Sequence, residues 1–230
     1  VITTAAQGHP NVKAMVFVAA FAPDVGESSL QLSGKFPGST LGDTLAPPVK
    51  TADGGSDLYI QQDKFPHQFA ADVPQAQAEL MAATQRPITL AALSEPSGDP
   101  AWKNIASWSI YGTADLNIPP AAMRFMADRA KAKRTVEIAG ASHVLMISHP
   151  SEVAALIEEA GERGGHLGPG GAGQRVPARK SIALEGHRAL EALVAVIVRT
   201  RTRSTAHVDD GALAAHRLDD GADAGVDLGD

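Results

Sequence analysis

Two side chains, Asp115 and His143, have the types and the spacing of an acid–base pair. Asp115 stands in GTADLNIPP, after one predicted strand, and His143 stands in GASHVLM, after the next strand, about 28 residues further on. Residues that follow neighbouring parallel strands meet at the carboxyl edge of a sheet, where ligands bind. A carboxylate on Nδ1 fixes the tautomer of an imidazole and stabilises its charged form, which leaves Nε2 free to take a proton.

Two other residues offer alternatives to this pair. His149 directly precedes Pro150 and a predicted helix, and we interpret it as a surface residue at the helix start. Asp24 follows the first predicted strand and could be the acid in place of Asp115. A loop aspartate that follows Pro23 in a turn is the simpler interpretation of Asp24.

The elements that must position the pair follow from hydrophobic patterning. Nearly continuous apolar runs predict buried parallel strands at residues 14–21, 106–112 and 135–140. Helices are predicted to begin at Pro119–Pro120 and at Pro150, because proline is favoured in the first turn. Strands that alternate with helices at this spacing predict right-handed βαβ units and an α/β fold with a parallel sheet.

Residues 22–100 have a different pattern, rich in proline and glycine. Short helical patches are predicted at 63–71, 74–84 and 88–93, so we interpret this segment as an inserted, mostly helical cap. Six apolar residues in this segment or directly before it are candidates for a substrate pocket under the cap, although core packing would explain most of them equally well. They are Phe21, Leu58, Tyr59, Phe65, Phe69 and Met81.

Composition excludes several classes of protein. The net charge of −6 argues against a nucleic-acid binder, and the absence of cysteine rules out disulfides and thiol chemistry. No apolar run approaches the ~20 residues that a membrane-spanning helix needs. We therefore expect a cytoplasmic protein that binds neither nucleic acid nor membrane.

The last seventy residues, 161–230, are predicted to be a Gly/Pro-rich linker and a largely disordered acidic tail. No aromatic residue occurs beyond Phe125, and the large apolar content is too low to offset the ~1–2 kcal/mol per residue that backbone ordering costs. Only residues 189–198, ALEALVAVIV, have enough apolar surface to become ordered. His207 and His216 with the tail aspartates could suggest a metal site, but a solvated acidic segment is the better interpretation, and we expect no metal.

Three stretches in order resemble the esterase and hydroxynitrile-lyase branch of the α/β-hydrolase family. They are VKAMVFVAAFAPDVGES, SIYGTADLNIPPAAMRFMADRA and VEIAGASHVLMISHPSEVAALI. The resemblance implies the C-terminal part of a doubly wound α/β-hydrolase fold over residues 1–160, with Asp115 as triad acid and His143 as triad base. It also implies that the first of the three strands lacks its sheet partner, so we expect an exposed edge and self-association.

A triad also needs a nucleophile, which the family places in a G-x-S-x-G elbow between a strand and a helix. VITTAAQ at the start of the chain is typical of the end of that helix, so we expect the serine and the oxyanion hole to precede Val1. Ser142, Ser107 and Ser109 are poor substitutes, since Ser142 adjoins the base and the other two lie within a strand.

The parent protein is therefore predicted to be a serine hydrolase of small carboxylic esters or related acyl compounds, which needs no cofactor. A hydroxynitrile-lyase-type enzyme on the same triad is an alternative, and a lysine beside the histidine would favour it. Lys35, Lys50 and Lys64 of the cap cannot be placed from sequence. A third hypothesis is that the protein is a non-catalytic fragment or pseudo-hydrolase. The 230-residue sequence fits this third hypothesis best.

Overall fold

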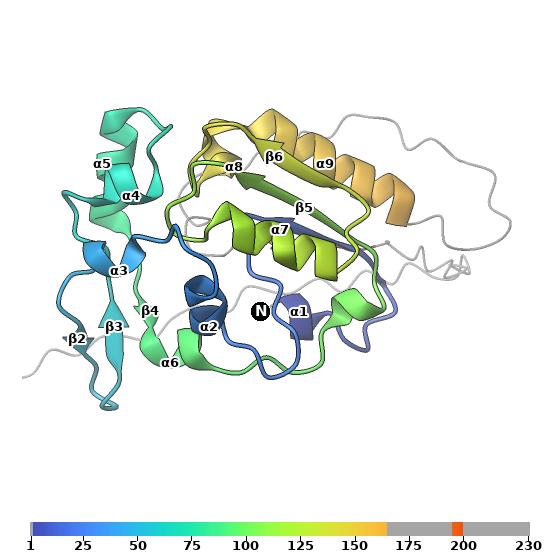
Figure 1. Cartoon of the computed structure of the whole chain (residues 1–230), viewed down its shortest axis with the longest axis horizontal. Coiled ribbons are helices and arrows are strands. Elements are labelled where there is room, and N and C mark those ends of the chain that lie inside the picture. Colours follow the sequence, from blue (N-terminus) through green and yellow to red (C-terminus); the bar gives the residue numbers. More distant parts are fainter. Residues whose placement is uncertain (1, 165–194, 200–230) are drawn as a thin grey trace, which may run out of the picture.

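The protein is described by a computed structural model over residues 2–164 and 195–199, and its centre is a four-stranded sheet in the order β6-β5-β1-β7 (Figure 1). The strands are β1 Val12–Val18, β5 Ser107–Gly112, β6 Thr135–Ile138 and β7 Ala195–Arg199. β1 pairs with β5, and β5 with β6, in parallel. The predicted α/β class with a parallel sheet is confirmed, and each of the three predicted strands overlaps an observed one.

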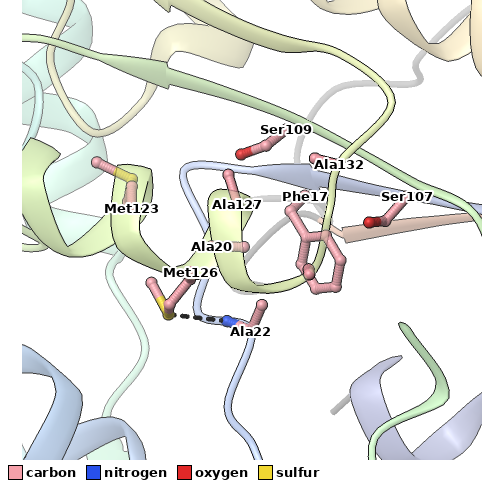
Figure 2. A pocket seen from close by; sticks show the side chains of 10 residues that line it. Phe17, Ala20, Ala22, Ser107, Ser109, Met123, Met126, Ala127 and Ala132 are labelled. Atoms are coloured by element: carbon pink, nitrogen blue, oxygen red, sulfur yellow. Dashed lines mark hydrogen bonds between the residues drawn. The ribbon is translucent and has the colours of Figure 1, made fainter. Parts of the chain in front are cut away.

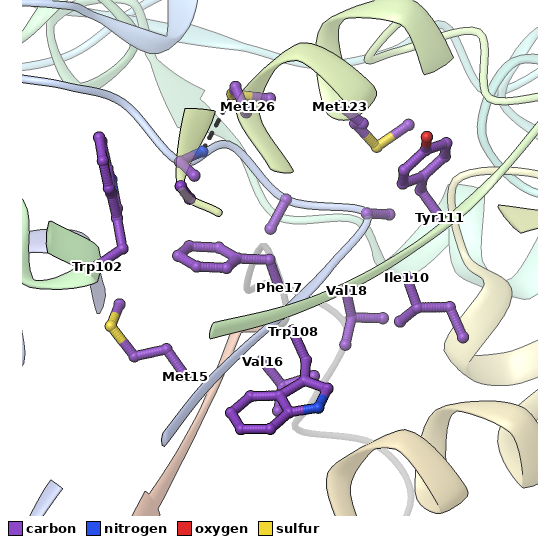
Figure 3. Close-up of a cluster of buried hydrophobic side chains, with 14 of the residues drawn as sticks. Met15, Val16, Phe17, Val18, Trp102, Trp108, Ile110, Tyr111, Met123 and Met126 are labelled. Atoms are coloured by element: carbon purple, nitrogen blue, oxygen red, sulfur yellow. Dashed lines mark hydrogen bonds between the residues drawn. The ribbon is translucent and has the colours of Figure 1, made fainter. Parts of the chain in front are cut away.

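Both faces of this sheet are covered, which explains its nearly continuous apolar runs. Along β5, Ser107 and Ser109 face helix α7 (Pro120–Arg129), whereas Trp108 between them faces α9 (Pro150–Gly164) and donates its indole N–H to Glu159. On β1, Val16 pairs with Trp108, and Figure 3 shows both in the buried cluster. Alternating side chains on a strand point to opposite faces, so a strand between two helical layers is apolar on both.

The two helices carry the apolar stripes that their spacing predicts. Met123, Met126 and Ala127 of α7 are buried, and Pro119 and Pro120 stand at its start. Buried residues of α9 are Val153, Leu156, Ala160 and Gly164, so this helix continues beyond residue 160. The remaining elements of the main body are α1 Ile2–Ala5, the 3₁₀ turn Ala101–Lys103 and α8 Leu145–Ser148.

The segment 22–100 contains more strand than predicted. Its helices are α2 Ser29–Gly34, α3 Leu41–Thr44, α4 Phe65–Phe69, α5 Gln75–Thr84 and α6 Leu90–Ser94. It also contains a small antiparallel sheet of β2 Val49–Lys50, β3 Ser56–Leu58 and β4 Ile88–Thr89. These strands have two or three residues, too few for a pattern of alternation to be visible in the sequence. A separate small core lies under α4 and α5, where Phe65, Ala78 and Met81 are buried.

The edge of β1 is not open, so the prediction of an unpaired strand is wrong in the described structure. β7 runs antiparallel along β1, with Met15 paired to Ile197 and Val16 to Val196. These residues belong to the one stretch of the last seventy residues that was predicted to become ordered. Self-association itself stays a prediction.

The rest of the predicted linker and tail, including His207 and His216, lies outside the described residues. Within residues 2–164 and 195–199, no helix is long and apolar enough to span a bilayer. The domain limits at residues 22, 100 and 160 and the cytoplasmic location stay predictions.

Candidate active site

The acid loop begins where β5 ends, and its carboxylate is fully buried. Asp115 Oδ1 accepts hydrogen bonds from the backbone N–H groups of Asn117 and Ile118, at 2.8 and 3.0 Å. Aspartate favours such local turns, because its short side chain reaches the amides two and three residues on. The turn fixes one carboxylate oxygen and leaves Oδ2 to interact outside the loop.

The base loop follows β6 and brings His143 to that free oxygen. Gly140 adopts a φ of 75°, which turns the chain back from the strand at a position where a side chain would be strained. His143 Nδ1–H donates to Asp115 Oδ2 at 2.7 Å, and the histidine side chain is 11% exposed. In this tautomer Nε2 is an acceptor, and it forms no hydrogen bond with any residue that the structure describes.

Backbone contacts lock the two loops together. Ala114 N–H donates to Ala141 O at 3.1 Å, Thr113 N–H donates to Ile138 O at 3.0 Å, and Gly140 N–H donates to Thr113 Oγ1 at 2.9 Å. Gly112 permits this crossing, since a Cβ there would lie 2.1 Å from Ala141 O. The acid and the base are therefore held by rigid backbone as well as by their own hydrogen bond.

Of the predicted pocket residues, the structure brings one into contact with the histidine. The Phe69 ring meets the His143 ring edge-on, with centroids 4.8 Å apart, and Phe65 stacks behind Phe69 at 4.9 Å. Phe65 and Met81 are buried in the small core, and Leu58 is buried at the end of the short strand β3. Phe69 therefore forms an apolar wall beside the candidate base.

The other two predicted pocket residues lie elsewhere. Phe21 is partly buried and packs against the main core. Tyr59 lines a groove of about 250 Å³ together with Ile60, Gln61 and Gln85, and neither Asp115 nor His143 lines that groove. Their role as substrate contacts stays a prediction.

Asp24 and Ser142, the other acid and a neighbouring serine considered from the sequence, each have a partner other than His143. Asp24 forms an ion pair with Lys103 at 2.7 Å, which lowers the pKa of its carboxyl group, so Asp24 has a partner other than the histidine. Ser142 Oγ donates a hydrogen bond to Asp72. Ser107 and Ser109 lie on the α7 side of β5, as Figure 2 shows.

A small cavity lies between β1, β5 and α7, and Figure 2 shows the side chains that line it. Its volume is about 10 Å³, and its lining includes Phe17, Ser107 and Met126 but neither Asp115 nor His143. A space of this size holds about one water molecule. The hydroxyl of Ser107 is buried there without a hydrogen-bond partner among the described residues.

Sequence patterns missed two cap residues that contact the site loops. Gln68, 2% exposed, donates through Nε2 to Leu116 O and Asn117 Oδ1 and accepts from Thr40 through Oε1. Its signal was available, because Phe65, Gln68 and Phe69 fall on one helical stripe and a polar residue within such a stripe needs buried partners. The second residue, Asp72, carried no comparable signal.

Asp72 follows α4 and contacts the base loop. Its carboxylate accepts from Ser142 Oγ and, at 2.6 Å, from Ser148 Oγ. Burial would raise the pKa of Asp72, but hydrogen bonds from these two hydroxyl groups and from the backbone N–H groups of Ser142 and Asp72 together outweigh it, so the pKa lies below its ordinary value. His149, the second histidine of the motif, lies with Nε2 3.7 Å from Asp72 Oδ2 and is 30% exposed.

No cluster of three or more metal-binding side chains occurs among the residues that the structure describes. The pair of a buried carboxylate and an imidazole is suited to acid–base chemistry.

Comparison with known proteins identifies the relatives of this fold. The model of the alpha/beta hydrolase family matches residues 1–156. The structure is similar to polyneuridine aldehyde esterase, with a TM-score of 0.53 and 19% identity over 64% of this chain and 62% of that one. It is also similar to tomato methylketone synthase I, with a TM-score of 0.56 and 18% identity over 70% and 66% of the two chains.

A pyrethroid hydrolase gives a TM-score of 0.53 at 18% identity over 72% of this chain and 67% of that chain. No curated protein sequence matches the chain. The chain thus spans about 62% of the length of polyneuridine aldehyde esterase, and likenesses at these identities establish the fold.

Proposed function

Because this chain belongs to the alpha/beta hydrolase family, we propose that Asp115 and His143 are the acid and the base of a catalytic triad in a serine hydrolase. The observation that supports this most directly is the 2.7 Å hydrogen bond between His143 Nδ1 and the fully buried Asp115 carboxylate. Two backbone amides fix the other oxygen of that carboxylate, so the imidazole is held with Nε2 free to act on a substrate or nucleophile.

In the proposed reaction, a serine hydroxyl attacks the carbonyl carbon of an acyl compound and His143 Nε2 takes the hydroxyl proton. Asp115 stabilises the imidazolium that forms and keeps Nδ1 protonated. His143 then gives the proton to the leaving alcohol, and water hydrolyses the acyl-enzyme in a second step with the same base. None of these steps requires a cofactor.

We assign the nucleophile and the oxyanion-hole amides to protein sequence upstream of Val1. The 230 residues contain no G-x-S-x-G, and Ser142 is hydrogen-bonded to Asp72. The chain by itself is then the acid–base portion of the site, and we propose that it is inactive alone.

We propose small carboxylic esters as the substrates. Phe69 gives the site an apolar wall beside His143, as an ester's acyl or alcohol group would require. An esterase, a methylesterase and a pyrethroid hydrolase among the similar structures are consistent with ester hydrolysis. The same fold also occurs in a methylketone synthase, so substrate identity must be tested directly.

A lyase on the same triad has no support from the cap lysines. Lys35 lies near Glu27 and over the Phe125 ring, Lys50 donates to Ser56, and Lys64 donates to the carbonyl of Asp43. None of these contacts involves His143.

Two enzyme preparations test the proposed function. The 230-residue chain should hydrolyse p-nitrophenyl acetate no faster than its His143→Ala variant, because loss of the nucleophile costs on the order of a million-fold in a serine enzyme. Turnover by this chain that depends on His143, or labelling of one of its serines by a fluorophosphonate, would contradict the assignment of the nucleophile upstream.

The second preparation is the protein encoded with its upstream sequence. There, His143→Ala and Asp115→Asn should each lower kcat by roughly 10⁴-fold or more. His149→Ala is the matched control and should leave kcat within a few-fold of the parent. Equal effects of the three substitutions would refute the assignment of the base.

A further inference from the structure

The cap carboxylate Asp72 bridges both ends of the segment that carries His143. Ser142 immediately precedes the histidine and Ser148 follows it by five residues, and each hydroxyl donates to a different oxygen of Asp72. Ser142 is 2% exposed and the Asp72 side chain 18% exposed, so the hydrogen bonds are largely shielded from water. Hydrogen bonds to an ionised carboxylate are shorter and roughly twice as strong as neutral ones.

The same end of α4 makes two further contacts with this segment. Ser142 Oγ lies 3.3 Å from the carbonyl oxygen of Phe69, and the Phe69 ring lies against His143. Between β6 and α8, the backbone around His143 has no regular secondary structure. The acid loop holds it from one side through Ala141, and Asp72 holds it from the cap side.

We propose that Asp72 is a positioning residue, which fixes the turn carrying His143 against the cap and thereby maintains the His143–Asp115 hydrogen bond. This inference rests on the proposed function, because it gives Asp72 a role in the site of Asp115 and His143. Catalytic groups need placement within about 0.5 Å, and their supporting hydrogen bonds provide it. Asp72 does not touch the reacting atoms and acts only through Ser142 and Ser148.

An asparagine at this position separates hydrogen bonding from charge. Its side-chain oxygen can accept from one serine, and its amide can donate to the hydroxyl oxygen of the other. Alanine can do neither. His149 Nε2 lies 3.7 Å from Asp72 Oδ2, and asparagine would remove the carboxylate charge beside that ring while keeping the bridge.

The test is the NMR signal of the His143 Nδ1–H proton in the 230-residue chain, assigned by its loss in His143→Ala. We expect a downfield, slowly exchanging signal in the parent chain that Asp115→Asn abolishes. Asp72→Ala should raise its exchange rate about tenfold or more, the factor that corresponds to loss of one hydrogen bond to a charged group. Asp72→Asn should retain the slow exchange, and Asp63→Ala, a change at an exposed cap aspartate, should have no effect.

The outcomes test the His143–Asp115 pair and the positioning role of Asp72 separately. Absence of the signal in the parent chain would refute the acid–base pair itself and the role of Asp72 with it. A normal signal in the parent that Asp72→Ala leaves unchanged would refute only the positioning role. Fast exchange in Asp72→Asn, matching Asp72→Ala, would refute the hydrogen-bonded bridge. If Asp72→Ala does not fold, Ser148→Ala decides, since it removes one arm of the bridge and should still accelerate exchange.

Discussion

Substitution of Gly112 by alanine should disrupt the candidate site through the backbone alone. A Cβ at this position would lie 2.1 Å from Ala141 O, 2.6 Å from Ala141 C and 2.8 Å from Ser142 O. Ordinary contacts begin at 3.4 Å, so the base loop would have to move by about 1.3 Å. No flexible side chain can give way, because all three atoms belong to the backbone.

That movement should affect both the stability of the fold and the position of His143. Overpacking a well-packed region costs about 1–3 kcal/mol, and we expect the free energy of unfolding to fall by an amount in that range. The displaced loop carries His143, and a misplacement of about 1 Å can cost on the order of 10²-fold in rate. A 10²-fold loss corresponds to about 2.8 kcal/mol, so we expect the effects on the site and on stability to be comparable in free energy and to appear together.

Urea unfolding and the His143 Nδ1–H signal measure these two effects on the same samples. Gly42→Ala is the matched control, because Gly42 lies in α3 and a Cβ there meets no atom within 4 Å. The control should keep the stability and the signal of the parent chain. If Gly112→Ala stayed within about 0.5 kcal/mol of the parent and kept the same signal, the close crossing of the two loops would be wrong.

Three further changes test other parts of the structure. Two hydrogen bonds from Arg129 lower the pKa of Glu27, so the stabilisation that they provide is present above pH 4.5 and is lost as the pH falls through the lowered pKa. Glu27→Gln should therefore lower the free energy of unfolding by about 1–3 kcal/mol near neutral pH. In acid-unfolding curves, the difference between the variant and the parent should shrink as the pH falls. Trp108→Ala should lower the free energy of unfolding by about 3–5 kcal/mol, since the side chain is 1% exposed, whereas Leu80→Ala at 53% exposure should change it little. Gln68→Ala should lower the free energy of unfolding by about 1–3 kcal/mol, because Asn117 Oδ1 and the Thr40 hydroxyl lose their partner on this side chain. Gln77→Ala, on the exposed side of α5, is its control.

Much of the main body was predictable because its signals are local. β1 and β5 are buried on both faces, so their apolar runs stand out, and the prolines mark the starts of α7 and α9. The meeting of Asp115 with His143 was predictable for a topological reason. Residues that follow adjacent parallel strands emerge at the same edge, whatever the rest of the fold does.

The small cap sheet and the position of the strand beside β1 were harder to predict from the sequence. β2 and β4 have two residues each, and all four residues are exposed, so neither burial nor alternation leaves a pattern. The strand β7 could be recognised as apolar, but its sheet position depends on an edge more than 170 residues earlier in the sequence. Pairing over such a distance is decided by the whole fold and by no local preference.

The sequence by itself determined the fold class. It also determined that the candidate acid follows one central strand and the candidate base follows the next, and which residue types they are. The sequence favoured Asp115 as the partner of His143 but left Asp24 as an alternative, and only the tertiary structure showed which partners these loop carboxylates have. Asp24, Asp72 and Asp115 are all loop aspartates, yet the first pairs with Lys103, the second binds two serines and the third binds His143. A carboxylate's role depends on the donors that surround it, and those donors come from segments 28 to 79 residues away.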